Sequence, residues 1–146
     1  MSFFDSLNIS ATGLTAERLQ MDVTAENLAN AQSTNNGTPY KPQAVELESI
    51  GSSGTFQNEL SSAMGGQAGT PGGVQVKGIV TENVPDQLVY DPGNPQANKQ
   101  GYVKEPNIQP VTEMTNLISE SNAYQADVTA MTTSKQMYSE TLQILK

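Results

Sequence analysis

Residues 114–145 read MTNLISESNAYQADVTAMTTSKQMYSETLQIL. The apolar side chains of this stretch return at alternating steps of three and four residues, which is the spacing of one face of an α-helix. This predicted C-terminal seam consists of Met114, Leu117, Ser121, Tyr124, Val128, Met131, Lys135, Tyr138, Leu142 and Leu145. Pro110 is tolerated in a first helical turn, and Glu113 suits the positive end of the helix. The pattern predicts a long helix within the segment 106–146.

The beginning of the chain repeats this pattern over residues 4–28. The predicted N-terminal seam consists of Phe4, Leu7, Ala11, Leu14, Arg18, Met21, Ala25 and Leu28. Alternating steps of three and four are the heptad of coiled coils, so we expect the N-terminal helix, within 1–32, to pair with the C-terminal one. The pair is expected to be antiparallel if one chain folds on itself. Polar residues at Arg18, Ser121 and Lys135 either fix the register of the pair or reach solvent.

A second apolar line runs along each predicted helix, away from the seam. It consists of Ile9, Ala16 and Val23 on the first helix and of Ala123, Ala130, Met137 and Ile144 on the second. A helix that is apolar on more than one face is usually buried on more than one face. Either the middle of the same chain covers these lines or other subunits do. We favour other subunits, because a small glycine-rich insert covers such long lines with difficulty.

The middle of the chain, residues 33–105, holds most of the glycine and nearly all of the proline. Short strands are predicted at 44–48, 74–77 and 88–90, and the last runs into a strong turn signal at 91–95. Glycine-rich runs at 51–55 and 65–73 look superficially like phosphate-binding loops, but no Gly-Lys-Ser/Thr run occurs, so a flexible linker is the better interpretation. The fold class predicted is mainly α with a small β insert between paired terminal helices.

Composition excludes several classes of function. The chain has 7 Lys and Arg against 15 Asp and Glu, a formal net charge of −8, and its basic residues form no stripe, which argues against nucleic acid as a partner. Cysteine and histidine are both absent, which removes disulfides, zinc sites and the common general base. Glu46 and Glu48 share a strand face, but a solvated strand edge is a simpler account than an acid–base pair. We expect no enzyme, no metal and no cofactor.

No apolar run is long enough to span a bilayer, so no direct membrane insertion is expected. The first seven residues, MSFFDSL, contain no basic region and no continuous apolar region. They are therefore not expected to act as a cleaved signal peptide.

Two motifs, one near each terminus, resemble those of the flagellar rod and hook protein family. The first is Asn27-Leu-Ala-Asn-Ala-Gln-Ser, followed after a short insert by Gly37-Thr-Pro-Tyr-Lys. The likeness rests there on Asn27, Leu28, Ala29, Asn30 and Tyr40. The second is the run EMTNLISESNAYQADV at 113–128. The resemblance is co-linear over the whole length, although residues 49–73 match nothing in it.

The resemblance implies a structural subunit of the bacterial flagellar basal body, exported by the flagellar type III apparatus without cleavage and polymerised in the periplasm as part of the proximal rod. The implied partners are copies of the chain itself and the rod proteins FlgB, FlgF, FlgG and FliE. The FlgB type differs because its Thr-Pro-Gly-Tyr follows the Ala-Asn directly, whereas residues 32–38 intervene here. A competing class is a coiled-coil adaptor that binds a partner helix and forms no polymer.

Overall fold

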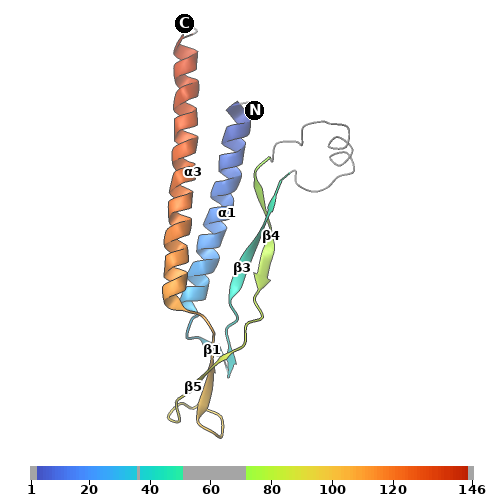
Figure 1. Cartoon of the computed structure of the whole chain (residues 1–146), viewed down its shortest axis with the longest axis vertical. Helices are drawn as coiled ribbons and strands as arrows, with labels where there is room; N and C mark the ends of the chain where they lie inside the picture. Colours follow the sequence, from blue (N-terminus) through green and yellow to red (C-terminus); the bar gives the residue numbers. More distant parts are fainter. Residues whose placement is uncertain (1–2, 36, 51–71, 145–146) are drawn as a thin grey trace, which may run out of the picture. The chain divides into compact units, whose positions relative to one another are not determined.

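The computed structural model describes residues 3–35, 37–50 and 72–144 of the chain. Two long helices, α1 (Phe3–Ala29) and α3 (Pro110–Ile144), stand at the two ends of the sequence, with short strands between them (Figure 1). The chain is therefore mainly helical with a small β insert, as the sequence predicts. Over the described ranges, no helix is long and apolar enough to cross a lipid bilayer.

Local chemistry explains where the two helices begin and end. Pro110 opens α3, where its missing N–H would have had no intrahelical partner. The carbonyl of Gln109 accepts a hydrogen bond from the backbone N–H of Thr112 at 3.0 Å and so closes the first turn. At the other helix, both the backbone N–H and the side-chain amide of Asn30 donate to the carbonyl of Glu26, at 3.0 and 2.9 Å. The carbonyl of Glu26 therefore accepts both the last helical bond and a side-chain bond, and the side chain of Asn30 caps the end of α1.

Six strands form three two-stranded pairs in the described part of the insert. They are β1 (Thr34–Asn35) with β2 (Thr38–Pro39), β3 (Gln43–Ser49) with β4 (Val74–Thr81), and β5 (Gln87–Tyr90) with β6 (Tyr102–Glu105). The strands predicted at 44–48, 74–77 and 88–90 are confirmed by β3, β4 and β5. The sequence did not predict β1, β2 or β6, whose runs are short and carry little alternation.

Backbone hydrogen bonds at both ends of the β3–β4 pair fix its direction. Ile50 N donates to Gly73 O at 2.9 Å, and Glu82 N donates to Pro42 O at 2.8 Å. The start of β3 therefore lies beside the end of β4, and the two strands run antiparallel. Lys77 Nζ on β4 also lies 2.7 Å from Glu46 Oε1 on β3, an exposed ion pair that contributes little stability.

The β5–β6 hairpin has two unlike faces. Leu88 is paired with Lys104 and Tyr90 with Tyr102, so these four side chains share one face. Val89 is paired with Val103 on the opposite face, where Val103 is buried. The connecting loop is held by side-chain turns, in which Asp91, Asn94 and Asn98 each accept a hydrogen bond from the backbone N–H two residues on, at 3.2, 3.0 and 2.8 Å.

The chain divides into two compact units, each of which contains part of both helices and part of the insert. The first comprises residues 1–18, 46–78 and 122–146, and the second comprises 19–45 and 79–121. In the first unit the rings of Phe4 and Tyr138 lie 6.3 Å apart, centroid to centroid. Gly13 also faces Asp127 across the helices, close enough that a Cβ atom there would meet the carboxylate.

Gly73 joins α1 to the strands in the first unit. Its φ of 119° lies in the left-handed region, which favours glycine. A Cβ at this position would also meet the hydroxyl of Thr12. That hydroxyl accepts a hydrogen bond from Val74 N at 3.2 Å and donates one to Ile9 O at 2.7 Å. The close approach of strand and helix therefore requires glycine here.

The second unit has a small core. Among its described residues, the buried apolar side chains are Val23, Ala31, Val103 and Ile108, together with Pro39, Pro42 and Pro106. Lys41 ties the insert together, because its ammonium group lies 2.7 Å from Asp86 Oδ1 and donates to Val84 O at 2.9 Å. This buried apolar surface is small. The free energy gained by burying it therefore exceeds the cost of the conformational entropy lost on folding by only a narrow margin.

Candidate assembly interface

Asn27, the first residue of the N-terminal motif, is buried and ties α1 to the insert. Its Nδ2 donates to the carbonyl of Gln43 at 2.8 Å, and its Oδ1 accepts from the N–H of the same residue at 2.9 Å. The hydroxyl of Tyr40 donates to the same Oδ1 at 3.3 Å. We call Asn27, Tyr40 and Gln43 the Asn27 clamp. The side-chain amide pairs with the backbone of Gln43 as a neighbouring strand would, so only Asn fits this length and geometry.

The other motif residues act differently from Asn27. Asn30 caps α1 through its bonds to Glu26, as described above. Leu28 is half-buried and Ala29 is exposed. Burial raises the pKa of the Tyr40 hydroxyl, and the charge of Glu26 raises it further. The motif therefore terminates the helix and attaches it to the strand that follows.

A cavity of about 200 Å³ adjoins the Asn27 clamp in the second unit. Three carboxylates, those of Glu82, Glu113 and Glu120, line it together with Val23 and Thr24 of α1. Burial raises the pKa of the Glu113 carboxyl, a hydrogen bond with Asn27 lowers it in part, and the charges of Glu120 and Glu82 raise it. The cavity thus lies between α1, α3 and the insert. The carboxylates that line it repel one another when they are ionised.

Glu120 bridges the two helices beside this cavity. Its Oε1 accepts a hydrogen bond from the hydroxyl of Thr24 at 2.9 Å, while its buried Oε2 has no hydrogen-bond partner among the described residues. Over the same residues, no three His, Cys, Asp or Glu side chains form a group that could hold a metal ion. The residues around the cavity therefore make structural contacts, and the Glu120 carboxyl group lies where α1 and α3 meet.

Comparison with known proteins covers the whole chain. Residues 99–144 match the family described as flagellar basal body rod FlgEFG protein C-terminal. The chain is 43% identical to the flagellar basal-body rod protein FlgC of Bacillus subtilis over 152 residues, which span 100% of both chains. It is 39% identical to that of Escherichia coli O6:H1 over 97% of both, and 36% identical to that of Borreliella burgdorferi over 100% of this chain and 99% of the relative.

The chain belongs to the FlgC family of flagellar basal-body rod proteins. It is a structural subunit of the basal-body rod and not an enzyme. The resemblance carried by the two terminal motifs is therefore confirmed. The chain is a component of the flagellar basal body.

In this FlgC family member the predicted seam residues are mixed on both helices, and Phe4, Arg18 and Ala25 of the α1 seam are exposed. Leu7, Leu14, Met21, Leu28, Leu117, Tyr124 and Met131 are half-buried, whereas Met114, Val128, Tyr138 and Leu142 are exposed. Leu145 lies outside the described residues. Two carboxyl side chains of α3 lie against α1, namely Glu120, which bonds to Thr24, and Asp127, which lies beside Gly13. On α3 these two carboxylates lie one residue before the predicted seam positions Ser121 and Val128.

The second apolar line of α1 is covered within the chain. Ala16 and Val23 are 3% and 5% exposed. Ile9 lines a hollow together with Leu47 and Val74, and Val23 lines the carboxylate cavity. Val23 thus packs beside residues 42–45 of the insert, which fits the alternative that the middle of the same chain covers this line. A contact of Ile9, Ala16 or Val23 with other subunits stays a prediction.

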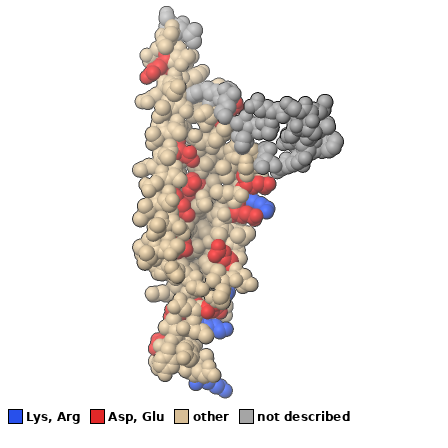
Figure 2. All heavy atoms as spheres, in the orientation of Figure 1, with Lys and Arg blue, Asp and Glu red and all other residues tan. Residues whose placement is uncertain are grey.

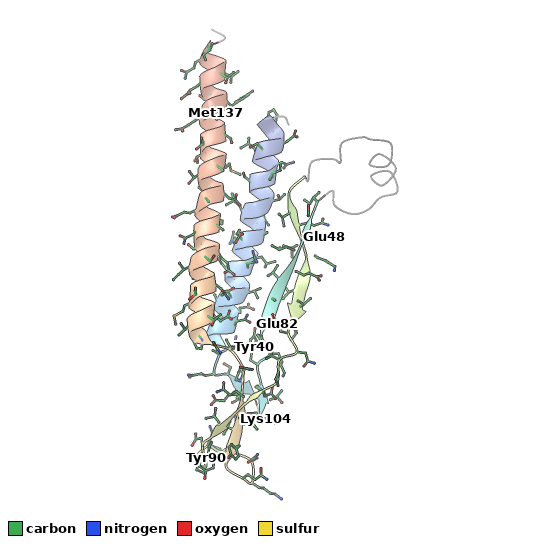
Figure 3. All side chains as sticks on the ribbon, in the orientation of Figure 1. Tyr40, Glu48, Glu82, Tyr90, Lys104 and Met137 are labelled. Atoms are coloured by element: carbon green, nitrogen blue, oxygen red, sulfur yellow. The ribbon has the colours of Figure 1, made fainter. Side chains whose placement is uncertain are left out.

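The corresponding line of α3 is open. Ala123 is half-buried and Ala130 is exposed, and the large side chains of Met137 and Ile144 are 63% and 85% exposed. Met137 is labelled on α3 in Figure 3. None of the described residues of α3 is buried. In Figure 2, acidic side chains are spread over the visible face and basic side chains are few, so no basic patch gathers there.

Proposed function

We propose that this chain polymerises with copies of itself and with other rod proteins to build the proximal rod in the periplasm. The observation that carries the proposal is the exposure of α3, which has 35 residues and no buried side chain among those described. A helix with large exposed apolar side chains is favoured when neighbours remove that surface from water. FlgB, FlgF, FlgG and FliE are the proposed partners, and membership of the FlgC family supports them as candidates.

We infer further that α1 and α3 form an antiparallel coiled coil in the rod. Contacts within each unit support this arrangement. Phe4 lies against Tyr138 in the first unit, and Thr24 bonds to Glu120 in the second. The half-buried residues of α3 support it too, since they recur at alternating steps of four and three. They are Glu113, Leu117, Glu120, Tyr124, Asp127, Met131 and Ser134, with Ala123 in addition.

Export by the flagellar type III apparatus, without cleavage of a signal peptide, is part of the same proposal. Membership of the FlgC family of basal-body rod proteins supports this route as a candidate for the chain.

The test uses a flagellated cell that lacks its own FlgC and expresses this chain instead. Charged residues replace the open apolar line of α3 in the expressed chain. A Met137→Asp/Ile144→Asp chain should be exported and fold, yet build no rod, because charges then occupy the surface that neighbours cover. The matched control is Gln136→Asp/Gln143→Asp, which places the same charges seven residues apart on exposed polar positions. Electron microscopy of isolated basal bodies and swimming motility give the readout.

Three results would contradict parts of this proposal. Normal basal bodies with the Met137→Asp/Ile144→Asp chain would remove the assigned role of this line. Failure of the unaltered chain to restore basal bodies would contradict the rod function itself. A discrete, non-polymeric complex of the concentrated chain with rod partners would favour the coiled-coil adaptor instead.

A further inference from the structure

The β5–β6 hairpin presents an apolar face that the described residues do not cover. Leu88, Tyr90 and Tyr102 on this face are 60%, 65% and 40% exposed. The two tyrosine rings stack edge to face with centroids 5.2 Å apart, so they form one continuous surface. Tyr90 and Lys104 of this hairpin are labelled in Figure 3. Exposed aromatic side chains that hold each other in place are typical of contact surfaces.

A second open apolar surface lies on the first turns of α3, in the same compact unit as the hairpin. Val111, Met114 and Ile118 are 77%, 50% and 61% exposed, and their spacing of three and four residues places them on one ridge. This ridge lies on a different face of the helix from Glu113, which turns toward Asn27. A single chain therefore carries two unlike apolar surfaces, one flat and aromatic and one ridged.

The two surfaces carry few acidic residues, although the whole chain is acidic and its copies repel one another. The formal net charge is −8, so copies approach best where acidic groups are sparse or matched. Within residues 87–105, Asp91 and Glu105 are matched by Lys99 and Lys104. Within 106–119 the only charged residue is Glu113, which is half-buried. The hairpin face carries the positive charge of Lys104, and the ridge has no charged residue of its own, so neither surface adds to the acidic repulsion between copies.

We propose that the Leu88, Tyr90 and Tyr102 face of one copy packs on the Val111, Met114 and Ile118 ridge of α3 in a second copy. This contact rests on the rod function proposed above and assigns it one subunit–subunit interface. Because it joins two different surfaces, it is heterologous and repeats along a helical assembly without closing on itself. Methionine sulfur against tyrosine rings is a favourable pairing for such a contact.

The contact is weak between two isolated copies. Two tyrosines and a leucine at these exposures offer on the order of 300 Å², less than the roughly 800 Å² per partner of a stable interface. It therefore forms in the assembled rod, where other contacts hold the copies in place, and not in dilute solution.

Cysteine pairs test the contact cleanly, because the chain has no cysteine of its own. A cell that lacks its own FlgC co-expresses two differently tagged copies, Leu88→Cys and Met114→Cys, and its isolated basal bodies are oxidised. We expect disulfide-linked dimers that carry both tags. Their yield should be at least tenfold above a pair of Leu88→Cys with Thr112→Cys, since Thr112 is exposed but lies off the ridge. Tyr102→Cys serves as a second hairpin position.

The outcomes separate the contact from the rod function. If tagged chains enter basal bodies but neither hairpin variant links to Met114→Cys, the contact is wrong while the rod function stands. Dimers from Leu88→Cys alone would indicate a symmetric contact and would also overturn it. A benzophenone probe on Met114→Cys should attach to residues 87–105 of another copy, and attachment to a different rod protein would assign the ridge to that protein instead. Absence of basal bodies with the unaltered chain would instead contradict the rod function.

Discussion

α1 and α3 are both long helices rich in apolar and small residues, but they are covered very differently. α1 includes four buried side chains, Ala16, Val23, Thr24 and Asn27, whereas the described residues of the longer α3 include none. In each unit α1 contacts both α3 and the insert. The chain therefore covers part of α1 by its own contacts and leaves the described residues of α3 exposed, which supports the proposal that neighbours cover α3. A rod subunit needs both properties, since it has to fold and then assemble.

The largest expected effect is the difference in lost stability when an Asp is placed on α1 and when an Asp is placed on α3. Val23→Asp should destabilise the isolated chain by about 4 kcal/mol, because it places a carboxylate beside the carboxylates of Glu82, Glu113 and Glu120. Met137→Asp should change stability by less than about 0.5 kcal/mol, since Met137 is exposed. Urea unfolding followed by circular dichroism measures both. Equal losses would erase the distinction between the two helices.

A smaller effect separates two asparagines of one motif. Asn27→Ala should cost about 3 kcal/mol, because it leaves the part-buried N–H and C=O of Gln43 and the hydroxyl of Tyr40 without this partner. Asn30→Ala should cost about 0.5 kcal/mol, since its side chain bonds an exposed helix end. The same unfolding measurement applies. A smaller loss at Asn27 than at Asn30 would mean that the Asn27 clamp does not fix α1 to the insert.

The smallest expected effect is a change in pH dependence. The pKa of Glu113 is raised in the folded chain, mainly by burial, so the folded state binds a proton more tightly than the unfolded state does. The resulting stabilisation is full below the ordinary pKa of 4.5 and is lost as pH rises through the folded value. Glu113→Gln should therefore flatten the fall of stability with rising pH. Its matched control is Glu140→Gln, an exposed carboxyl of α3 outside the cavity, and an unchanged profile for Glu113→Gln would contradict the assignment.

Much of the fold follows from periodicity in the sequence. The heptad spacing predicts both helices, and α1 and α3 lie within the predicted segments 1–32 and 106–146. Alternation of apolar and polar residues predicts β3 and β4, and on β4 half-buried and exposed residues alternate from Val74 to Ile79. The pairing partner of β5 could not be predicted, since β6 has only four residues and follows an eleven-residue loop whose path depends on side-chain turns.

The buried face of α1 was harder to predict than its length. Leu7, Leu14 and Met21 are the larger side chains and favour one seam, yet Ala16 and Val23 are the buried ones. A helix covered on two sides has apolar residues around most of its circumference, so periodicity alone does not rank its faces. The motif containing Asn27 was found by resemblance, but its role was not, because its partner Gln43 lies 16 residues away beyond a turn.

The meeting of Gly73 and Thr12 also bears on how the sequence can evolve. Any larger residue at 73 has to accept a left-handed backbone and displace a hydroxyl that already binds Val74. A compensating change at Thr12 alone would first give up that bond, so either order of mutation passes through a less stable ancestor. Selection for a working flagellum therefore disfavours a first substitution at either position. Gly73 and Thr12 are expected to change together or not at all.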